Sequence, residues 1–415
     1  MQSLNLIVLV MALVIPSVVR ADEGAVTLQD LEQEALRNNP EIKMAVKKTE
    51  AARERSSAAS GLPDPMIGYE YKNVGSLTKS TIGTEEMSMS GIVVSQEIPF
   101  PGKLSTMGRS AVKAAEQLQE NERDTRLRVL SSLRNAYYEY YLAYRSSEIL
   151  EENKEVMKSF QRIAETRYAT GQGIQQDVLR AQLEVSMMLD RIAEEERKKE
   201  VQAGVINALA GRDPLAPLSR PADVVKATLD VSLDEISSRS LAHSPQIKAK
   251  ERMVEQGEEE LSLSKRQYLP DMVVSAGRFD RKDLTPVWEA SVMFKVPLYF
   301  WNKASGVSAA SAELGAARHD QDAVKLGVLS RVRELYAMAR TAEHHLHLYE
   351  AGILPQAEMA LRSAASSYQV GKVDFQALLD AEGLLLKYRL TYQEELVNLS
   401  KTLAMLRETM GEEHE

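Results

Sequence analysis

Apolar and polar positions follow two periods along this chain, and the longer period predicts helices. Apolar residues recur three and four positions apart in the Pro-free segment 103–168, and again near the C-terminus at Leu396, Leu399, Leu403 and Leu406. This spacing is typical of helices that pack side by side with a left-handed supercoil. As one helix, the segment 103–168 would reach roughly 100 Å. Gly-containing segments follow each long run, which predicts two helical hairpins with tight tips.

The shorter period, two residues, predicts two pairs of strands. Apolar residues alternate with polar ones from Trp288 to Val296, from Ile67 to Tyr71, and from Ile92 onward, with Gly91 as a possible bulge. About nine residues suffice for a tilted transmembrane strand whose polar face lines a lumen. Four strands do not close a barrel, so closure would need several protomers. Two ordinary hairpins of a soluble α+β protein explain the alternation equally well.

The chain contains an internal sequence repeat. The segment TLQDLEQEALRNNPEI at 27–42 reappears as SLDEISSRSLAHSPQI at 232–247, and VLSSLRNAY at 129–137 reappears as VLSRVRELY at 328–336. YATG at 168–171 and VLRA at 178–181 likewise return as YQVG at 368–371 and LLDA at 378–381. Matched blocks in the same order, far more than 50 residues apart, indicate a duplicated unit of domain size rather than a solenoid repeat.

These patterns divide the chain into four parts. Residues 1–21 are read as a signal peptide, 22–212 as the first repeat, 213–231 as a linker and 232–415 as the second repeat. The first repeat has strands near 66–74 and 89–98 and a helical hairpin over 103–211. The second has strands near 272–279 and 288–296 and a hairpin over 303–410.

The N-terminal segment is the only long apolar run. LNLIVLVMALVIPSVV at 4–19 is short for a membrane span and contains Pro16, and small residues follow it where a signal peptidase would cleave. A retained membrane anchor is the alternative. If the mature protein enters a membrane, the sequence therefore requires it to do so as strands.

Composition excludes several classes of protein. The 415 residues include no Cys, so disulfides, thiolate metal sites and a lipid-modified N-terminal Cys are ruled out. A net charge of -9 without a basic block argues against nucleic acid as a partner. The low Pro, Gly and aromatic content favours a mainly helical chain.

The ordered motifs resemble the TolC-type outer-membrane efflux proteins over nearly the whole chain from Thr27 to Met410. They are the leading helix that contains ALRNNPEI at 35–42, Leu-Pro-Asp at 62–64 and 269–271, VSQEIPFPGK at 94–103, and YQVG followed by LLDA. The resemblance implies a homotrimer whose twelve-stranded β-barrel in the outer membrane continues as a long α-helical periplasmic tunnel. It also implies a periplasmic adaptor and an inner-membrane RND-type pump as partners. The segment QEIPFPGK at 96–103 is similar to heavy-metal cation efflux members.

The same resemblance points to a gate at the hairpin tips. Asp380 matches a family position that forms an acidic ring at the periplasmic constriction, while the second acidic position of that pattern is Ala377 here. Asp177 matches a latch carboxylate, and Val373 replaces its basic partner, so Lys372 or Arg180 is the candidate substitute. Three like charges on a threefold axis repel each other and attract cations. Solvated helix-face carboxylates are the plainer interpretation of Asp380 and Asp177. The tip residues expected to contact the adaptor are Gly171, Gly173, Val370 and Gly371.

Other candidate chemistry is sparse. His344 and His347 lie one helical turn apart and could share a metal ion, although exposed histidines on a helix explain them as simply. Met66, Met87, Met89 and Met107 surround the first strand pair, and thioethers suit soft metal ions, but packing explains them too. No phosphate-binding loop and no catalytic constellation can be identified. We predict no cofactor and no enzymatic activity.

We therefore expect an outer-membrane exit duct that passively conducts what a pump and an adaptor deliver, with heavy-metal cations as the candidate cargo. A periplasmic coiled-coil adaptor or scaffold without channel activity is the alternative, because it too would use long hairpins. A secreted helical enzyme or binding protein is a further possibility, which the lack of a polar constellation disfavours.

Overall fold

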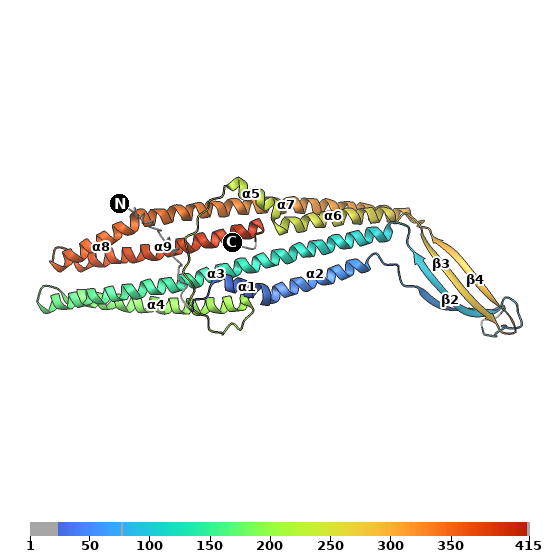
Figure 1. The fold of residues 1–415 in the computed structure, drawn as a ribbon, viewed down its shortest axis with the longest axis horizontal. Helices are drawn as coiled ribbons and strands as arrows, with labels where there is room; N and C mark the ends of the chain where they lie inside the picture. Colours follow the sequence, from blue (N-terminus) through green and yellow to red (C-terminus); the bar gives the residue numbers. More distant parts are fainter. Residues whose placement is uncertain (1–23, 76–77, 413–415) are drawn as a thin grey trace, which may run out of the picture.

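The protein is an elongated, mainly helical molecule with a small sheet at one end and two helical hairpin tips at the other (Figure 1). The computed structural model describes residues 24–75 and 78–412, so the predicted signal peptide lies outside the described residues. The first half contains α1 (Leu28–Asn38), α2 (Pro40–Ala58), β1 (Met66–Lys72), β2 (Met89–Ile98), α3 (Lys103–Ala169) and α4 (Gln175–Ala210). The second contains α5 (Leu233–His243), α6 (Pro245–Arg266), β3 (Asp271–Arg281), β4 (Leu284–Lys295), α7 (Phe300–Leu348), a π-helix (Tyr349–Ile353), α8 (Leu354–Gln369) and α9 (Phe375–Met410).

The prediction of a single leading helix is wrong, because two separate helices stand at that place in both halves. Asn39 ends α1 and caps α2, where its side-chain oxygen accepts the backbone N–H groups of Glu41 and Ile42 at 2.8 and 3.2 Å. Pro40 then occupies the first helical turn, where its missing N–H removes no hydrogen bond. Ser244 and Pro245 separate α5 from α6 at the matching place, with Pro245 in the first helical turn but without a side-chain cap from Ser244. Two short helices therefore precede each strand pair.

The long second-half helix is interrupted in a way that the sequence pattern did not predict. A π-helical turn at Tyr349–Ile353 separates α7 from α8, and Pro355 follows in the first turn of α8. Proline removes one backbone hydrogen bond and its ring would clash with the carbonyl of Ala351 in a regular helix. The wider π turn directly before Pro355 accommodates that ring, so the helix continues toward the tip.

The four strands form one antiparallel sheet in the order β1-β2-β3-β4, so β2 and β3 join the two halves. One face is mainly apolar and exposed, with Arg278 among its residues, and the other carries most of the polar side chains together with Val93, Val273 and Met293. Lys72 of β1 and Glu289 of β4, on the two edge strands, lie 2.7 Å apart. The exposed apolar face consists of Ile67, Tyr69, Tyr71, Ile92, Val94, Val274, Trp288, Val292 and Phe294.

A glycine permits the close approach of β2 and β3. A Cβ added to Gly91 would lie only 2.1 Å from the carbonyl oxygen of Arg278 on the neighbouring strand. The expected bulge at Gly91 is wrong, because Gly91 pairs in register with both Glu70 and Phe279. The register shift lies instead between Phe279 and Arg281, in the β3–β4 pair. A close approach of backbones, rather than an extra residue, explains this glycine.

Three apolar clusters hold the helices together. The first packs α1, α2, α3 and α4 with part of α9, the second packs α5, α6, α7 and α9, and the third lies at the tips and joins both hairpins. The tyrosine stripe of α3 belongs to the first cluster. Tyr137 is buried and donates its hydroxyl to the backbone oxygens of Val26 and Ala222 at 3.2 and 3.3 Å. Packing therefore explains the stripe.

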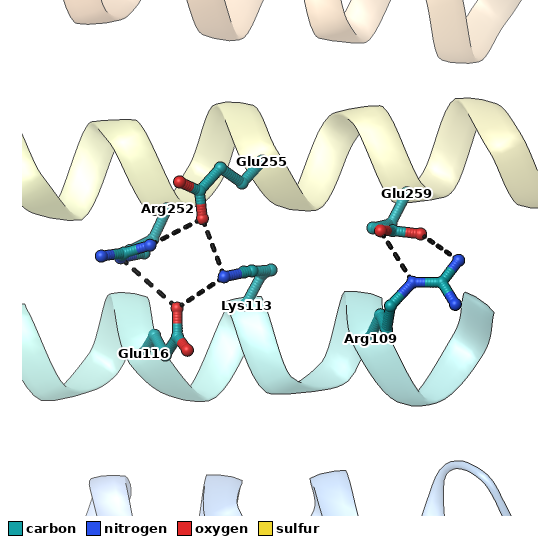
Figure 2. Close-up of polar contacts among 6 residues, drawn as sticks. All are labelled: Arg109, Lys113, Glu116, Arg252, Glu255 and Glu259. Atoms are coloured by element: carbon teal, nitrogen blue, oxygen red, sulfur yellow. Dashed lines mark hydrogen bonds and ion pairs between the residues drawn. The ribbon is translucent and has the colours of Figure 1, made fainter. Parts of the chain in front are cut away.

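Ion pairs join α3 to α6 between the sheet and the middle of the molecule (Figure 2). Lys113 of α3 contacts both Glu116 and Glu255 at 3.0 Å, and Arg252 of α6 contacts the same two carboxylates at 3.4 and 2.7 Å. One turn nearer the sheet, Arg109 donates two 2.9 Å hydrogen bonds to Glu259. The first long helix is thus tied to the second half of the chain by alternating charges.

Among the residues that the structure describes, no helix is both long enough and apolar enough to span a membrane.

Candidate gate at the hairpin tips

The two tips have the same backbone geometry. Gly171 and Gly371 follow α3 and α8 with φ of 69° and 74°, a left-handed conformation that glycine adopts without strain. Each glycine N–H donates to a tyrosine carbonyl three residues earlier, at 3.0 Å in both tips. Val370 is 67% exposed, and Gly171 and Gly371 are exposed as well. The tips therefore present backbone and small side chains to solvent.

A buried tyrosine joins the tip of the second hairpin to the first. Tyr368 of α8 is only 2% exposed, and its hydroxyl donates to a carboxylate oxygen of Asp177 on α4 at 3.3 Å. Burial, together with the charge of Asp177, raises the pKa of Tyr368 to about 12, so the hydroxyl stays protonated at neutral pH. Asp177 thus accepts a hydrogen bond across the seam between the hairpins.

Arg167 of α3 occupies the same junction. Its guanidinium lies 4.6 Å from the centre of the Tyr368 ring, and it donates to the carbonyl oxygens of Tyr368 and Gln172. Arg167 therefore places a cation beside Tyr368, while Lys372 or Arg180 stays the predicted basic partner of Asp177. Lys372 is exposed at the tip, with its backbone N–H bonded to Ser367. Gly173 packs closely enough that an added Cβ would lie 3.1 Å from Cβ of Arg167.

A second polar contact joins the hairpins one turn further from the tip. Arg180 of α4 donates to the side-chain oxygen of Gln376 at 2.6 Å, and the amide of Gln376 donates to Asp380 at 2.7 Å. Asp380 is exposed on α9 and, with Arg180 and Gln376, borders a groove of about 720 Å³ between α4 and α9. Asp380 and Arg180 are thus connected through an amide rather than directly.

The groove also contains an acidic residue that the sequence analysis missed. Glu382 of α9 is 3% exposed, and one of its carboxylate oxygens accepts a hydrogen bond from the amide of Asn153 on α3. Burial, reinforced by the charge of Glu184, raises the pKa of Glu382 to about 7. In sequence, Glu382 looks like one more acidic residue of an amphipathic helix. Its spacing of four from Leu378 and Leu386 was the available signal.

Metal-binding groups are not brought together. Within residues 24–75 and 78–412, no three His, Cys, Asp or Glu side chains are grouped so that they could hold a metal ion. His345, which lies between the predicted candidates His344 and His347, is 3.1 Å from a carboxylate oxygen of Glu395. The methionines are divided, because Met89 is buried whereas Met66, Met87 and Met107 are exposed.

Comparison with known proteins agrees with this fold. The family model described as "Outer membrane efflux protein" matches residues 31–212 and 236–412. The cation efflux system protein CusC of Escherichia coli K12 is 22% identical over 88% of this chain and 82% of its own length. The probable outer membrane lipoprotein SilC of Salmonella typhimurium is 21% identical over 84% of this chain and 78% of its own length.

Solved structures give the same result for the fold. A CusC crystal structure superposes with a TM-score of 0.81 at 17% identity, covering 93% of this chain and 92% of that one. VceC of Vibrio cholerae gives 0.79 at 18% identity, covering 93% and 96%. Because the family model matches both halves and most of the described residues, the chain belongs to the outer membrane efflux protein family, the TolC-type channels.

Proposed function

We propose that this protein is the exit duct of a tripartite efflux system. Three copies would combine their four-stranded sheets into a twelve-stranded barrel in the outer membrane, and their helices into a periplasmic tunnel. The observation that carries this proposal is the two-faced sheet, which lies at the opposite end from the tips (Figure 1). Its apolar face suits lipid, and its polar face suits a water-filled lumen.

Transport through this duct would be passive. The sequence contains no phosphate-binding loop of the Gly-x-x-x-x-Gly-Lys-Ser/Thr type, so energy would come from a partner pump. We infer a periplasmic adaptor and an inner-membrane RND-type pump as those partners. The tip residues Gly171, Gly173, Val370 and Gly371 would contact the adaptor.

The tips would form the gate. Asp380, bonded to Gln376, and Asp177, bonded to Tyr368, each participate in a contact between the two hairpins. Opening the duct would separate these contacts, with Arg180 and Lys372 as nearby cations. In a trimer the three Asp380 carboxylates would face a common axis, and such a ring would favour cations over anions.

Heavy-metal cations are the cargo that we propose. The support is the name of one relative, the cation efflux system protein CusC, together with the QEIPFPGK segment. The duct itself would carry what its pump selects, so a test of cargo belongs to the assembled system.

Conductance of the purified protein in planar bilayers tests the duct and its gate. We expect an outer-membrane protein that cross-links as a trimer and conducts weakly. Asp380→Ala should raise the conductance several-fold, because it removes the acceptor at the end of the Arg180–Gln376–Asp380 contact. Glu165→Ala, which removes an exposed carboxylate on α3, should leave the conductance unchanged. A monomer recovered in the periplasmic fraction would contradict the duct, and an unchanged trimer conductance would remove Asp380 from the gate.

A further inference from the structure

The most unusual side chain near the tips is the carboxylate of Glu382. It lies on the face of α9 that packs into the tip cluster, one helical turn from the buried residues Leu378 and Leu386. Only 3% of Glu382 is exposed. Acidic side chains are almost never buried this fully unless they are paired with a cation or bound to a metal. Glu382 therefore needs an explanation beyond helix solubility.

The partner that Glu382 contacts is neutral and belongs to the other hairpin. The Asn153 amide of α3 donates to one of its carboxylate oxygens. From α4, Glu184 repels a negative charge at this position while Arg191 attracts one, and Arg389 of α9 also attracts one. The Arg389 guanidinium also forms ion pairs with Glu152 of α3 and Glu358 of α8, at 3.4 and 3.8 Å.

Grooves open on two sides of this carboxylate. The larger runs between α4 and α9, and a smaller one is bordered by α3, α8 and α9; Glu382 lines both. The other charged groups that line them are Arg180, Asp380, Lys387, Glu394 and Arg362. Acids and bases are nearly balanced in this set, so the surroundings supply no strong counter-charge to an ionised Glu382. Because Glu382 is only 3% exposed at the floor of these grooves, its carboxylate gains full hydration when the hairpins separate along the seam that the grooves border.

We propose that Glu382 is a proton-sensitive lock between the α3/α4 and α8/α9 hairpins, closed when its carboxyl group is neutral and loosened when the group ionises. The neutral group packs between the helices and still accepts the Asn153 hydrogen bond. The ionised group is stabilised by water, and water becomes available when the hairpins move apart. The consequence for transport rests on the proposed function, since it makes these tips the gate of the duct.

The direction of the pH dependence follows from burial. In the closed tips the pKa of Glu382 is about 7, whereas a hydrated glutamate has a pKa of 4.5. Closed packing is therefore favoured most below pH 4.5, loses its advantage as the pH rises from 4.5 to 7, and changes no further above 7. Over that interval the ratio of open to closed tips should rise by at most about tenfold per pH unit.

Hydrogen–deuterium exchange of the full-length protein measures the lock without requiring transport. Exchange of the tip amides in α9 is compared between wild type and Glu382→Gln at each pH from 4.5 to 8. Glutamine keeps the shape and the acceptor but does not ionise, and the intrinsic pH dependence of exchange cancels in the ratio. We expect the ratio of the wild-type exchange rate to the Glu382→Gln exchange rate to be near one at pH 4.5. The ratio should then rise with pH and level off near pH 7.

Two further variants make the result specific. Glu394→Gln removes an exposed carboxylate of the same helix and the same groove, and its ratio to wild type should not change with pH. Glu184→Gln removes the repelling charge, so its exchange should level off at a lower pH than that of wild type. A flat wild-type-to-Glu382→Gln ratio, or an equal response to Glu394→Gln, would overturn the lock. A rising ratio in a protein that conducts at no pH would support the lock and contradict the duct.

Discussion

At the scale of single residues, the tips are defined by side chains that meet from distant parts of the sequence. Tyr368, Asp177 and Arg167 come from three different helices and converge on one junction. The centre of the Tyr368 ring lies 5.3 Å from that of Phe375. This packing holds the Tyr368 hydroxyl in position. The Tyr368 hydroxyl is thus one of the contacts that connect the second hairpin to the first.

Removing that hydroxyl should loosen the tips without disturbing their packing. Tyr368→Phe keeps the ring and its contact with Arg167 but removes the hydrogen bond to Asp177. A hydrogen bond to a charged acceptor contributes roughly 1.5–3 kcal/mol, and the 3.3 Å length suggests the lower end. We expect faster tryptic cleavage near Arg167 and Lys372, measured as the rate of loss of the intact chain.

The first repeat offers the matched control for this variant. Tyr168 occupies the corresponding place before its own tip glycine but is 50% exposed. Trypsin should therefore cleave the Tyr168→Phe variant at the wild-type rate. Equal rates for wild type and Tyr368→Phe would mean that the hydroxyl does not hold the tips together.

Sequence alone predicted part of this junction. The repeated YATG and YQVG segments located both tips, and the resemblance selected Asp177 and Asp380. Arg167 was missed because it looks like an ordinary basic residue at the end of a helix, and its contact with Tyr368 spans 201 positions. Glu382 was missed because ionisable residues on amphipathic helices are usually solvated, and only the packing of three helices shows its burial.

At the scale of helices and strands, ion pairs cross the interface between α3 and α6. Lys113, Glu116, Arg252 and Glu255 alternate in sign around a closed ring (Figure 2). Their side chains are 28–40% exposed, so water and salt screen each pair. The ring therefore sets how the two helices are aligned more than it stabilises the fold.

Replacing Lys113 tests the contribution of this ring. Lys113→Met keeps most of the aliphatic stem but removes two ion pairs and leaves Glu116 and Glu255 with one cation fewer. We expect a loss of roughly 1 kcal/mol in stability. The corresponding fall in the melting temperature should be small and should shrink in high salt, because screening weakens the pairs that the wild type retains. Circular dichroism melts at low and high ionic strength measure both effects.

Lys158→Met is the control for this experiment. Lys158 pairs with Glu155 within α3 only, and both side chains are well exposed. Its melting temperature should match that of the wild type in low salt. A fall as large as that of Lys113→Met would show that the interhelical ring has no special role.

Element boundaries were predictable to the extent that they depend on local sequence. The heptad-like spacing predicted α3 and α9, and alternation predicted β2 and β4. The break at Asn39 escaped notice because the residues on both sides of it continue the helical pattern. The π turn before Pro355 is a local widening that apolar periodicity does not encode. Strand β3 alternates poorly because glycine and small residues replace side chains where strands approach closely.

At the scale of the whole molecule, the sheet lies at one end of the long axis and the hairpin tips at the other (Figure 1). The tips combine turn glycines with single exposed residues such as Ile174 and Val370, whereas the sheet carries a cluster of exposed apolar side chains. Patches of this kind mark surfaces that are covered in the working assembly. Both tryptophans of the chain lie at this end: Trp288 is 77% exposed in β4, and Trp301 is 64% exposed in the first turn of α7.

Because the chain has only these two tryptophans, their fluorescence reports directly on how the sheet sits in a bilayer. With the sheet inserted, Trp288 lies in mid-strand and faces lipid, while Trp301 lies at the boundary toward the helices, where aromatic residues favour the interface. We expect lipids brominated deep in the acyl chain to quench Trp288, and lipids brominated near the headgroup to quench Trp301. Trp301→Phe and Trp288→Phe leave one reporter each and separate the two signals. Strong quenching of both by aqueous iodide, with none by brominated lipid, would mean that the apolar face of the sheet is covered by something other than membrane.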